Sequence, residues 1–389
     1  MHIRHLIGSL DRGGAEHFLV RLVVGIAERE PTWHQSVWTL TNNVPLAPDL
    51  ERAAIEVRTF DGSKSPRGIA RLAALPRTMA SEPCSLLQCW MYHAEVLGVL
   101  SRLRGARAPQ VWTLRQSRLS SDANSHMTRL LMRVCAWGSR HVPAAIVAGS
   151  QAALEAHRAI GYRAPLMPTI HNGVDVTRFA PNREARSRRR SAWGLADDTI
   201  AIGYLARFSA VKAHDDLLAA AAQLIQTPGL PPWRLVLVGN GTAPGDEPLA
   251  SMIRKAGLEA QVICAGVDAD PAAALAGFDI AASSSRGEGF PNAVAEGMAT
   301  GVPTVATDVG DTRALLGDSP YLVPPAQPER FAAAITVLLR LPASERRALG
   351  DSLRRRIEQD FDIDTAVDAY AALYRQIISG ATNGRIGPV

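Results

Sequence analysis

The sequence predicts an α/β fold made of two doubly wound domains, each a parallel sheet covered by helices. Its 389 residues exceed one ordinary core and suit two domains of roughly 150 to 200 residues each. Short apolar segments typical of buried strands alternate with helical patterns in two successive series, which favours parallel sheets. Apolar residues make up 47% and charged residues 20% of the chain, which excludes disordered and fibrous proteins.

The first series begins with a strand at 2–8, a glycine turn at Arg12-Gly13-Gly14 and a helix from Ala15 to about Glu30. The same reading predicts strands near 34–40, 54–59, 84–90, 109–114 and 144–148, and helices near 66–80, 92–104, 126–139 and 150–160. A strand-like segment at 166–171 follows. We place the first domain at 1–180 and, because the next stretch is polar and rich in arginine, a linker at 181–198, within which residues 187–193 are either linker or the start of a helix.

The second series repeats the alternation and defines a domain at 199–360. Its strands are predicted near 200–206, 233–238, 261–265, 278–283, 302–306 and 320–323, with late helices near 327–340, 343–358 and 362–379. We expect residues 361–389 to form a C-terminal helix that packs back on the first domain. Ligands of such folds bind at the carboxyl ends of the strands, so the cleft between the domains is the expected site.

Positive charge is concentrated in the first half of the chain. Residues 1–180 carry 21 Lys and Arg against 13 Asp and Glu, residues 181–190 five against one, and residues 191–389 16 against 23. A basic half can attract an anionic membrane or nucleic acid, or it can be an ordinary solvated surface. Nucleic acid is disfavoured because the arginines are not interleaved with aromatic residues.

Cysteine usage and hydropathy indicate the compartment. The four cysteines, Cys84, Cys89, Cys135 and Cys264, show neither metal-ligand spacing nor a disulfide framework. No apolar stretch reaches about 18 residues, and no signal-peptide pattern opens the chain. We therefore expect a cytoplasmic protein, with the basic half favouring peripheral attachment to the inner face of the cytoplasmic membrane.

The most informative segment follows the predicted strand at 278–283. Its loop holds Glu288 between two glycines, Pro291 then opens a helix, and Glu296 lies eight residues after the first carboxylate. The glycines allow close backbone approach, and the helix N-terminus suits a phosphate. Two carboxylates suit the hydroxyls of a sugar and a ribose. The alternative is a capped helix with two solvated glutamates.

The spacing of Glu288 and Glu296 resembles the E-x7-E motif of retaining glycosyltransferases of the GT-B fold, of the family 4 or group 1 type. Other family motifs are matched in the same order along nearly the whole chain: Gly13-Gly14-Ala15-Glu16, Asn172-Gly173-Val174-Asp175, Arg207 with Lys212, and Gly239-Asn240-Gly241. The resemblance implies two Rossmann-like domains that face an interdomain cleft.

The resemblance also implies roles for individual residues. Arg207 and Lys212 would clamp the donor diphosphate and stabilise its growing charge, so that no metal is required. Glu288 would bind the transferred sugar and Glu296 the ribose. The other donor-binding residues would be Gly13, Gly14, Gly239, Gly241, Val267, Gly289, Phe290, Asn292 and Ala293. Asp268-Ala269-Asp270 has the spacing of a metal site, but it lies in the base-binding loop of the family, and we expect no metal there.

One position departs from the family pattern. Many members carry a histidine at the end of the strand predicted at 109–114, where this sequence has Arg115. His93, after the preceding strand, is the nearest alternative, although a lone histidine there is often structural. Arg115 can instead face the diphosphate with its fixed charge. We therefore retain both as candidate catalytic residues.

These observations predict a retaining glycosyltransferase that moves a sugar from a UDP- or GDP-sugar to a glycan or lipid-linked acceptor in cell-surface polysaccharide biosynthesis. Two alternatives stay open: a nucleotide-sugar epimerase or hydrolase of the same fold, and a non-catalytic sugar-nucleotide-binding protein, which the missing histidine favours. A Rossmann dehydrogenase is disfavoured because the first glycine turn lacks the G-x-G-x-x-G pattern.

Overall fold

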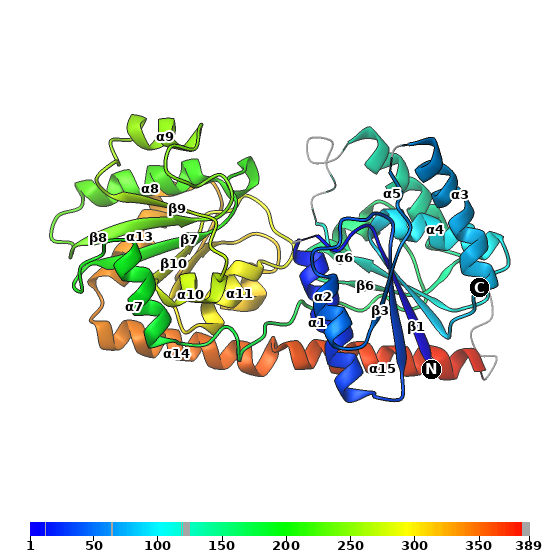
Figure 1. The fold of residues 1–389 in the computed structure, drawn as a ribbon. Coiled ribbons are helices and arrows are strands. Elements are labelled where there is room, and N and C mark those ends of the chain that lie inside the picture. The colour runs from blue at the N-terminus through cyan, green and yellow to red at the C-terminus, as the bar shows by residue number, and fades with distance from the viewer. Residues whose placement is uncertain (12, 64, 118, 120–124, 383–389) are drawn as a thin grey trace. The chain divides into compact units, whose positions relative to one another are not determined.

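The computed structural model describes the chain except for residues 12, 64, 118, 120–124 and 383–389 (Figure 1). It divides into two compact units, one formed by residues 1–173 with the C-terminal helix from Ile363 onward, the other by Val174–Asp362. Each unit contains a six-stranded parallel sheet covered by helices on both faces. The predicted α/β fold with two doubly wound domains is confirmed.

The first unit has the strand order β3-β2-β1-β4-β5-β6. Its strands are β1 (His2–Ile7), β2 (His34–Thr39), β3 (Glu56–Thr59), β4 (Leu86–Trp90), β5 (Gln110–Leu114) and β6 (Pro143–Ala148). Helices α1 (Gly14–Arg29), α2 (Ala47–Arg52) and α15 (Ile363–Thr382) cover one face. Helices α3 (Pro66–Ser81), α4 (Met91–Leu103), α5 (His126–Gly138) and α6 (Gln151–Ala159) cover the other. The order reverses between β1 and β4, so the loops after these strands flank a crevice at the carboxyl edge.

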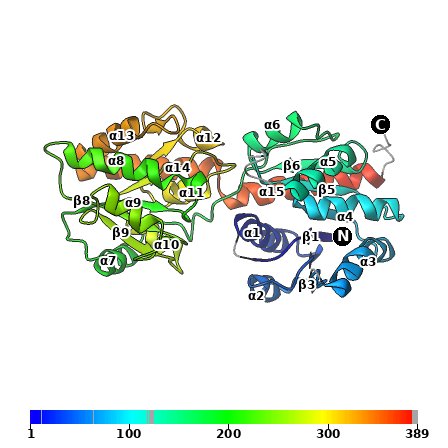
Figure 2. The same ribbon diagram turned by 90° about the horizontal axis from the view of Figure 1, so that it is seen from above.

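The second unit has the order β12-β11-β10-β7-β8-β9 and reverses between β7 and β10. Its strands are β7 (Ile200–Leu205), β8 (Trp233–Val238), β9 (Val262–Gly266), β10 (Ile280–Ser283), β11 (Thr304–Thr307) and β12 (Leu322–Val323). Its helices are α7 (Arg183–Ala192), η1 (Ala210–Lys212), α8 (His214–Gln226), α9 (Leu249–Lys255), α10 (Pro271–Ala276), α11 (Asn292–Ala299), α12 (Thr312–Leu316), α13 (Pro328–Arg340) and α14 (Ala343–Asp360). Figure 2 shows α8 and α13 packed side by side on one face of this sheet.

The boundary between the units lies earlier than residue 180, where we expected it. Val174 donates its backbone N–H to the carbonyl of Phe361 (2.8 Å), and Arg354 on α14 donates to the carbonyl of Phe179 (3.1 Å). These bonds attach residues 174–180 to the second unit. The expected strand-like segment at 166–171 makes only isolated bridges to β6, at Leu166 and Thr169.

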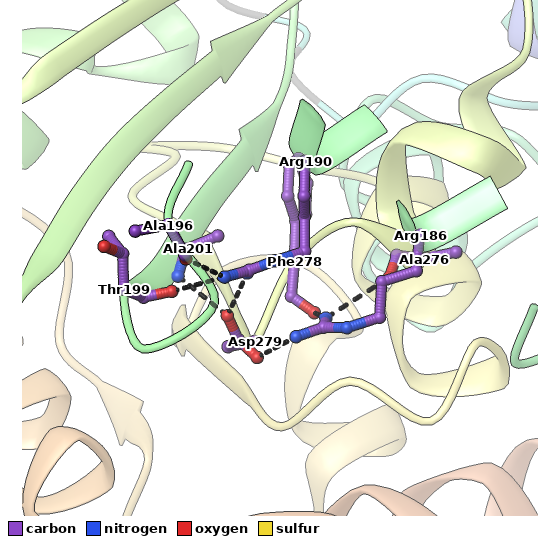
Figure 3. A network of polar contacts seen from close by, with 8 residues as sticks. All are labelled: Arg186, Arg190, Ala196, Thr199, Ala201, Ala276, Phe278 and Asp279. Atoms are coloured by element: carbon purple, nitrogen blue, oxygen red, sulfur yellow. Dashed lines mark hydrogen bonds and ion pairs between the residues drawn. The ribbon is translucent and has the colours of Figure 1, made fainter. Parts of the chain in front are cut away.

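The predicted linker at 181–198 is instead helix α7 and its flanks, which belong to the second unit. Asp279, which directly precedes β10, binds both Arg186 (2.6 Å) and Arg190 (2.7 Å), as Figure 3 shows. Arg190 also donates to the carbonyls of Ala196 and Thr199. The arginines that suggest a solvated linker therefore fasten a helix to the edge of the sheet.

Helix α15 packs within the first unit, against α1. Its buried face includes Val367, Tyr370 and Tyr374, which join the core that α1 forms with the sheet. Asp364 and Asp368 both pair with Arg29 near the end of α1, at 2.8 and 2.7 Å. Every helix in the described part of the chain is too short or too polar to span a bilayer.

Candidate active site

The loops that follow β7 and β10 meet at the carboxyl edge of the second sheet. Lys212 closes the short helix η1 after β7, and Glu288 lies in the loop after β10. The Lys212 ammonium nitrogen lies 2.5 Å from Oε1 of Glu288, and the two side chains are only 22% and 13% exposed. The predicted diphosphate-binding lysine and the predicted sugar-binding glutamate therefore form one partly buried ion pair.

Glu288 is held by groups that the sequence analysis did not identify. Ser285 donates its hydroxyl to Oε1 of Glu288 (2.6 Å), and Asp311 donates its backbone N–H to the carbonyl of Gly289 (2.9 Å). Gly310 has φ +56°, and a Cβ there would collide with the carbonyl oxygens of Glu288 and Gly289. The polar run Ser283-Ser284-Ser285 and the glycine after β11 are the only features of the sequence that point to these contacts.

The backbone at Lys212 and Ala213 is held by side chains from β7 and from the loop after β10. Tyr204 donates its hydroxyl to the carbonyl of Lys212 (2.6 Å), and Ser284 donates to that of Ala213 (2.9 Å). His214 packs between the rings of Tyr204 and Phe208, at centroid distances of 4.9 and 5.2 Å. Burial lowers the pKa of His214 to about 4, so this ring is neutral at physiological pH and serves packing.

Arg286 ties the loop after β10 to the start of α8. Its guanidinium lies 2.6 Å from both Asp215 and Asp216, and its backbone N–H donates to the carbonyl of Val211 (2.8 Å). The two loops that hold Lys212 and Glu288 are thus linked a second time, at a point where neither of those residues takes part.

The glycine turn after β8 packs on the segment that carries Arg207. Gly239 has φ +147°, and a Cβ there would collide with the carbonyl of Ala206. Beside it, Phe208 donates its backbone N–H to the carbonyl of Asn240 (2.7 Å), and Gly241, with φ +77°, lies against Phe208. The Arg207 side chain is exposed, and among the described residues it makes no ion pair. Its charge is accessible at this edge.

The remaining predicted donor-binding residues lie on the same edge. Asn292 and Ala293 begin α11, Phe290 is buried before it, and Glu296 lies half-buried one turn into the helix. Val267 follows β9 and is 72% exposed. Because β9 is an edge strand, Val267 lies two strands away from β7.

The Asp-x-Asp segment has an internal partner. Both carboxylate oxygens of Asp268 bind Arg189 of α7, each at 2.7 Å. Across the residues that the structure describes, no three His, Cys, Asp or Glu side chains are grouped so that they could share a metal ion. Asp268 therefore anchors α7.

In the first unit, two sets of candidate residues lie at the carboxyl ends of the neighbouring strands β1 and β4. Gly13 caps α1 and Gly14 begins it, and a Cβ at Gly13 would clash with the carboxylate of Glu16. His93 lies exposed in the first turn of α4, after Met91, whose φ is +68°. The strand order thus brings the glycine turn and His93 to one edge, as doubly wound topology requires.

Arg115 makes contacts that the sequence did not indicate. Its guanidinium donates to the hydroxyl of Tyr370 on α15 (2.9 Å) and to the side-chain oxygen of Asn172. It stacks over the ring of Phe18 at 4.1 Å and near that of Trp90 at 5.3 Å. Burial lowers the pKa of Arg115, and the Tyr370 hydroxyl opposes that shift. These contacts connect β5 to α1 and α15.

Comparison with known families agrees with this geometry. A model of "Glycosyltransferase Family 4" matches residues 12–178, and a model of "Glycosyl transferases group 1" matches residues 199–340. The chain belongs to the GT-B glycosyltransferases of the group 1 and family 4 type. The two matches fall in the two units, one in each.

Individual relatives of this family cover part or all of the chain. The D-inositol 3-phosphate glycosyltransferase of Rhodococcus erythropolis is 28% identical over 59% of this chain and 52% of its own length. That of Kineococcus radiotolerans is 32% identical over 53% and 51%. The chain thus matches about half the length of these relatives. HepE of Anabaena, solved in complex with UDP-glucose, has a TM-score of 0.82 and 25% identity over 97% of this chain and all of that one.

The contacts of Arg115 predict a structural contribution from this residue. Arg115→Ala should lower the free energy of unfolding by about 2 to 3 kcal/mol, the usual value of hydrogen bonds to a charged group. Denaturant titration of the purified protein measures the change. His93→Ala is the control, with an expected change within about 0.5 kcal/mol because the side chain is exposed. Wild-type stability with strongly reduced turnover in Arg115→Ala would instead support a role at the diphosphate.

The second link between the loops predicts that Arg286 positions the site. Arg286→Ala should reduce turnover roughly tenfold to a hundredfold, because small displacements of catalytic groups are costly. Stability should change by about 1 kcal/mol or less, since Arg286 and Asp215 are 38% and 49% exposed and only Asp216, at 17%, is mostly buried. Amide hydrogen exchange at 284–291 should become faster. Arg254→Ala, which breaks a comparable exposed pair with Glu247, is the control; unchanged exchange at 284–291 would show that the loop is held without Arg286.

Proposed function

We propose that this protein is a retaining glycosyltransferase that moves a sugar from a UDP- or GDP-sugar to a glycan or lipid-linked acceptor in cell-surface polysaccharide biosynthesis. The observation that carries the proposal is the Lys212–Glu288 pair at the carboxyl edge of the second sheet, beside the exposed charge of Arg207. The likeness to HepE, solved with UDP-glucose, supports a nucleotide-sugar donor.

The cations of this edge suit a diphosphate leaving group. An ammonium has three donors, and Glu288 takes one of those of Lys212, so further donors can bind phosphate oxygens. The Arg207 guanidinium offers a bidentate fork, and the N-terminus of α11 adds a partial positive charge. Together these groups would stabilise the negative charge that grows on the departing phosphate oxygen.

The two glutamates suit the two ends of the donor. A carboxylate has about four acceptor sites, so Glu288 can accept from a sugar hydroxyl as well as from Lys212 and Ser285. Glu296 lies eight residues further on, one turn into α11, where it would accept from the ribose hydroxyls. The pair would thereby fix an elongated donor by both of its sugars.

The configuration of the anomeric carbon is retained if the acceptor attacks that carbon on the same face from which the diphosphate departs. The acceptor oxygen forms its bond to the anomeric carbon as the bond from that carbon to the phosphate oxygen breaks. The acceptor proton passes to the departing phosphate oxygen. This route needs positioning and charge stabilisation and no dedicated protein base, so the absence of the family histidine at position 115 is compatible with turnover.

Donor binding tests the assignment directly. Glu296→Ala and Arg207→Ala should each weaken the binding of nucleoside diphosphate by about 1.5 to 3 kcal/mol, the range for a hydrogen bond to a charged group. Calorimetric titration, after a thermal-shift screen of UDP- and GDP-sugars, measures the loss. Glu259→Ala and Arg254→Ala change exposed charges near α9 and serve as matched controls. Unchanged affinity in both site variants would refute the donor site.

Turnover tests the reaction class once the donor is known. The acceptor panel includes lipid-linked glycans and, because of the relatives' names, an inositol phosphate. Transfer to an acceptor supports the proposal. Donor consumption without an acceptor would favour an epimerase or hydrolase, and tight binding without turnover would favour a non-catalytic binding protein.

We also propose that catalysis requires no metal ion, since Arg207, Lys212 and α11 supply positive charge where the diphosphate would lie. Turnover measured with EDTA should therefore stay within about twofold of turnover measured without it. The reason is that the protein itself carries the charge that stabilises the leaving group. Assays with and without chelator, on metal-stripped protein, measure this. Complete loss with EDTA that manganese restores would contradict the proposal.

For location, we propose a cytoplasmic protein that attaches peripherally to the anionic inner face of the membrane. The excess of 21 Lys and Arg over 13 Asp and Glu in residues 1–180 supports this, because each basic residue near such a surface adds about 1 kcal/mol of attraction. A membrane location would also bring the protein to a lipid-linked acceptor.

A further inference from the structure

Helix α5 carries apolar side chains on both of its sides. Met132, Cys135 and Ala136 face inward and are buried in the core of the first unit. On the outside, four large apolar residues are exposed by 38 to 63% of their surface: Met127, Leu130, Val134 and Trp137. Their spacing of three and four residues places them on one stripe of the helix. A surface helix of a globular protein ordinarily has polar residues there.

Basic residues lie on and beside the same stripe. His126 and Arg133 are exposed within it, and the exposed Arg140 and His141 follow shortly after the helix. Residues 125–141 include no Asp or Glu. Helix α4 packs beside α5 (Figure 1) and adds further exposed apolar and basic residues, Leu100, Leu103, Arg102 and Arg104.

From these observations we infer that the outer stripe of α5, formed by residues 126, 127, 130, 133, 134 and 137, docks on an anionic lipid bilayer. This inference rests on the membrane attachment in the proposed function and names the surface that carries it. The apolar residues would enter the region between headgroups and acyl chains, where Trp137 has its preferred environment. Arg133 and Arg140 would pair with lipid phosphates.

A bilayer suits this stripe better than a second copy of the chain does. In a symmetric dimer the same stripe would face itself, which would bring arginines from both copies together without an acidic partner. An anionic bilayer supplies apolar chains and phosphates at one surface, so both kinds of side chain on the stripe gain a partner.

The direction of α5 determines which edge of the first sheet docking would bring close to the membrane. A helix that connects two parallel strands runs antiparallel to them, so the amino end of α5 lies toward the carboxyl edge of the first sheet. That edge carries Gly14 and His93. Docking through α5 would hold this edge near the membrane surface, where the head of a lipid-linked acceptor is located.

Vesicle flotation tests the surface. Wild-type protein should float with phosphatidylglycerol-containing vesicles and not with pure phosphatidylcholine vesicles, and added salt should weaken the binding. The double variant Leu130→Glu/Val134→Glu should bind roughly tenfold more weakly or worse, because two charges would enter the apolar layer. Val337→Glu, which alters an apolar residue 50% exposed on α13, is the matched control and should float as wild type does.

Tryptophan fluorescence reports the docking depth independently of affinity. All seven tryptophans lie in the described residues, and Trp137 alone among them is exposed. Brominated anionic lipids should therefore quench the wild-type protein, and Trp137→Phe should remove most of that quenching. Circular dichroism and the affinity for the nucleotide donor verify that each variant is folded, since no residue of the stripe belongs to the donor site.

The outcomes separate the two proposals. If wild-type protein floats and the α5 double variant floats equally well, docking through α5 is refuted while membrane attachment stands. If wild-type protein binds no vesicles, both membrane proposals fail, and donor binding still decides the enzyme assignment. A wild-type dimer that Leu130→Glu/Val134→Glu converts to a monomer would overturn lipid docking in favour of self-association.

Discussion

The ion pair between Lys212 and Glu288 is the contact on which the candidate site depends. It joins two loops that are separated by 76 residues in the sequence and adjacent only because β7 and β10 are neighbours in the sheet. A partly buried pair of this kind is favourable only if its geometry is fixed and its remaining polar groups are satisfied. Ser285, Tyr204 and Arg286 supply that support, so the protein's own contacts fix the geometry of the pair.

Much of the fold is readable from the sequence because parallel strands buried on both faces are short and continuously apolar. The twelve strands found in the described residues lie within about two residues of their predicted positions. The prediction of a linker at 181–198 is wrong, and the reason is also physical. Five arginines in ten residues look like a solvated segment, but three of them pair with Asp268 and Asp279. These partners lie about 80 to 90 residues away and are identifiable only when the sheet is formed.

In the candidate site, too, contacts between residues that are distant in the sequence could not be predicted. Glycines and carboxylates at strand ends point to Gly239, Glu288 and Glu296, since each loop has its own local pattern. Contacts between loops have no such pattern, which is why Gly310 and Arg286 were missed. Arg115 is the extreme case: its hydrogen-bond partner Tyr370 is 255 residues away, on a helix that belongs to the first unit only by its packing.

In the proposed function, the Lys212–Glu288 pair keeps its own contact while each partner gains a further one from the donor. Each charge of the pair satisfies the other, so neither is left uncompensated in its partly buried place. A diphosphate that approaches Lys212 brings more negative charge than Glu288 holds, and the sugar that follows brings hydroxyl donors for the carboxylate. The ammonium has further N–H donors and the carboxylate has further lone pairs, so each can add a contact while the pair and the hydrogen bonds around it stay in place. Such a site has little reorganisation to undergo when the leaving group develops its charge, which is the condition for effective electrostatic catalysis.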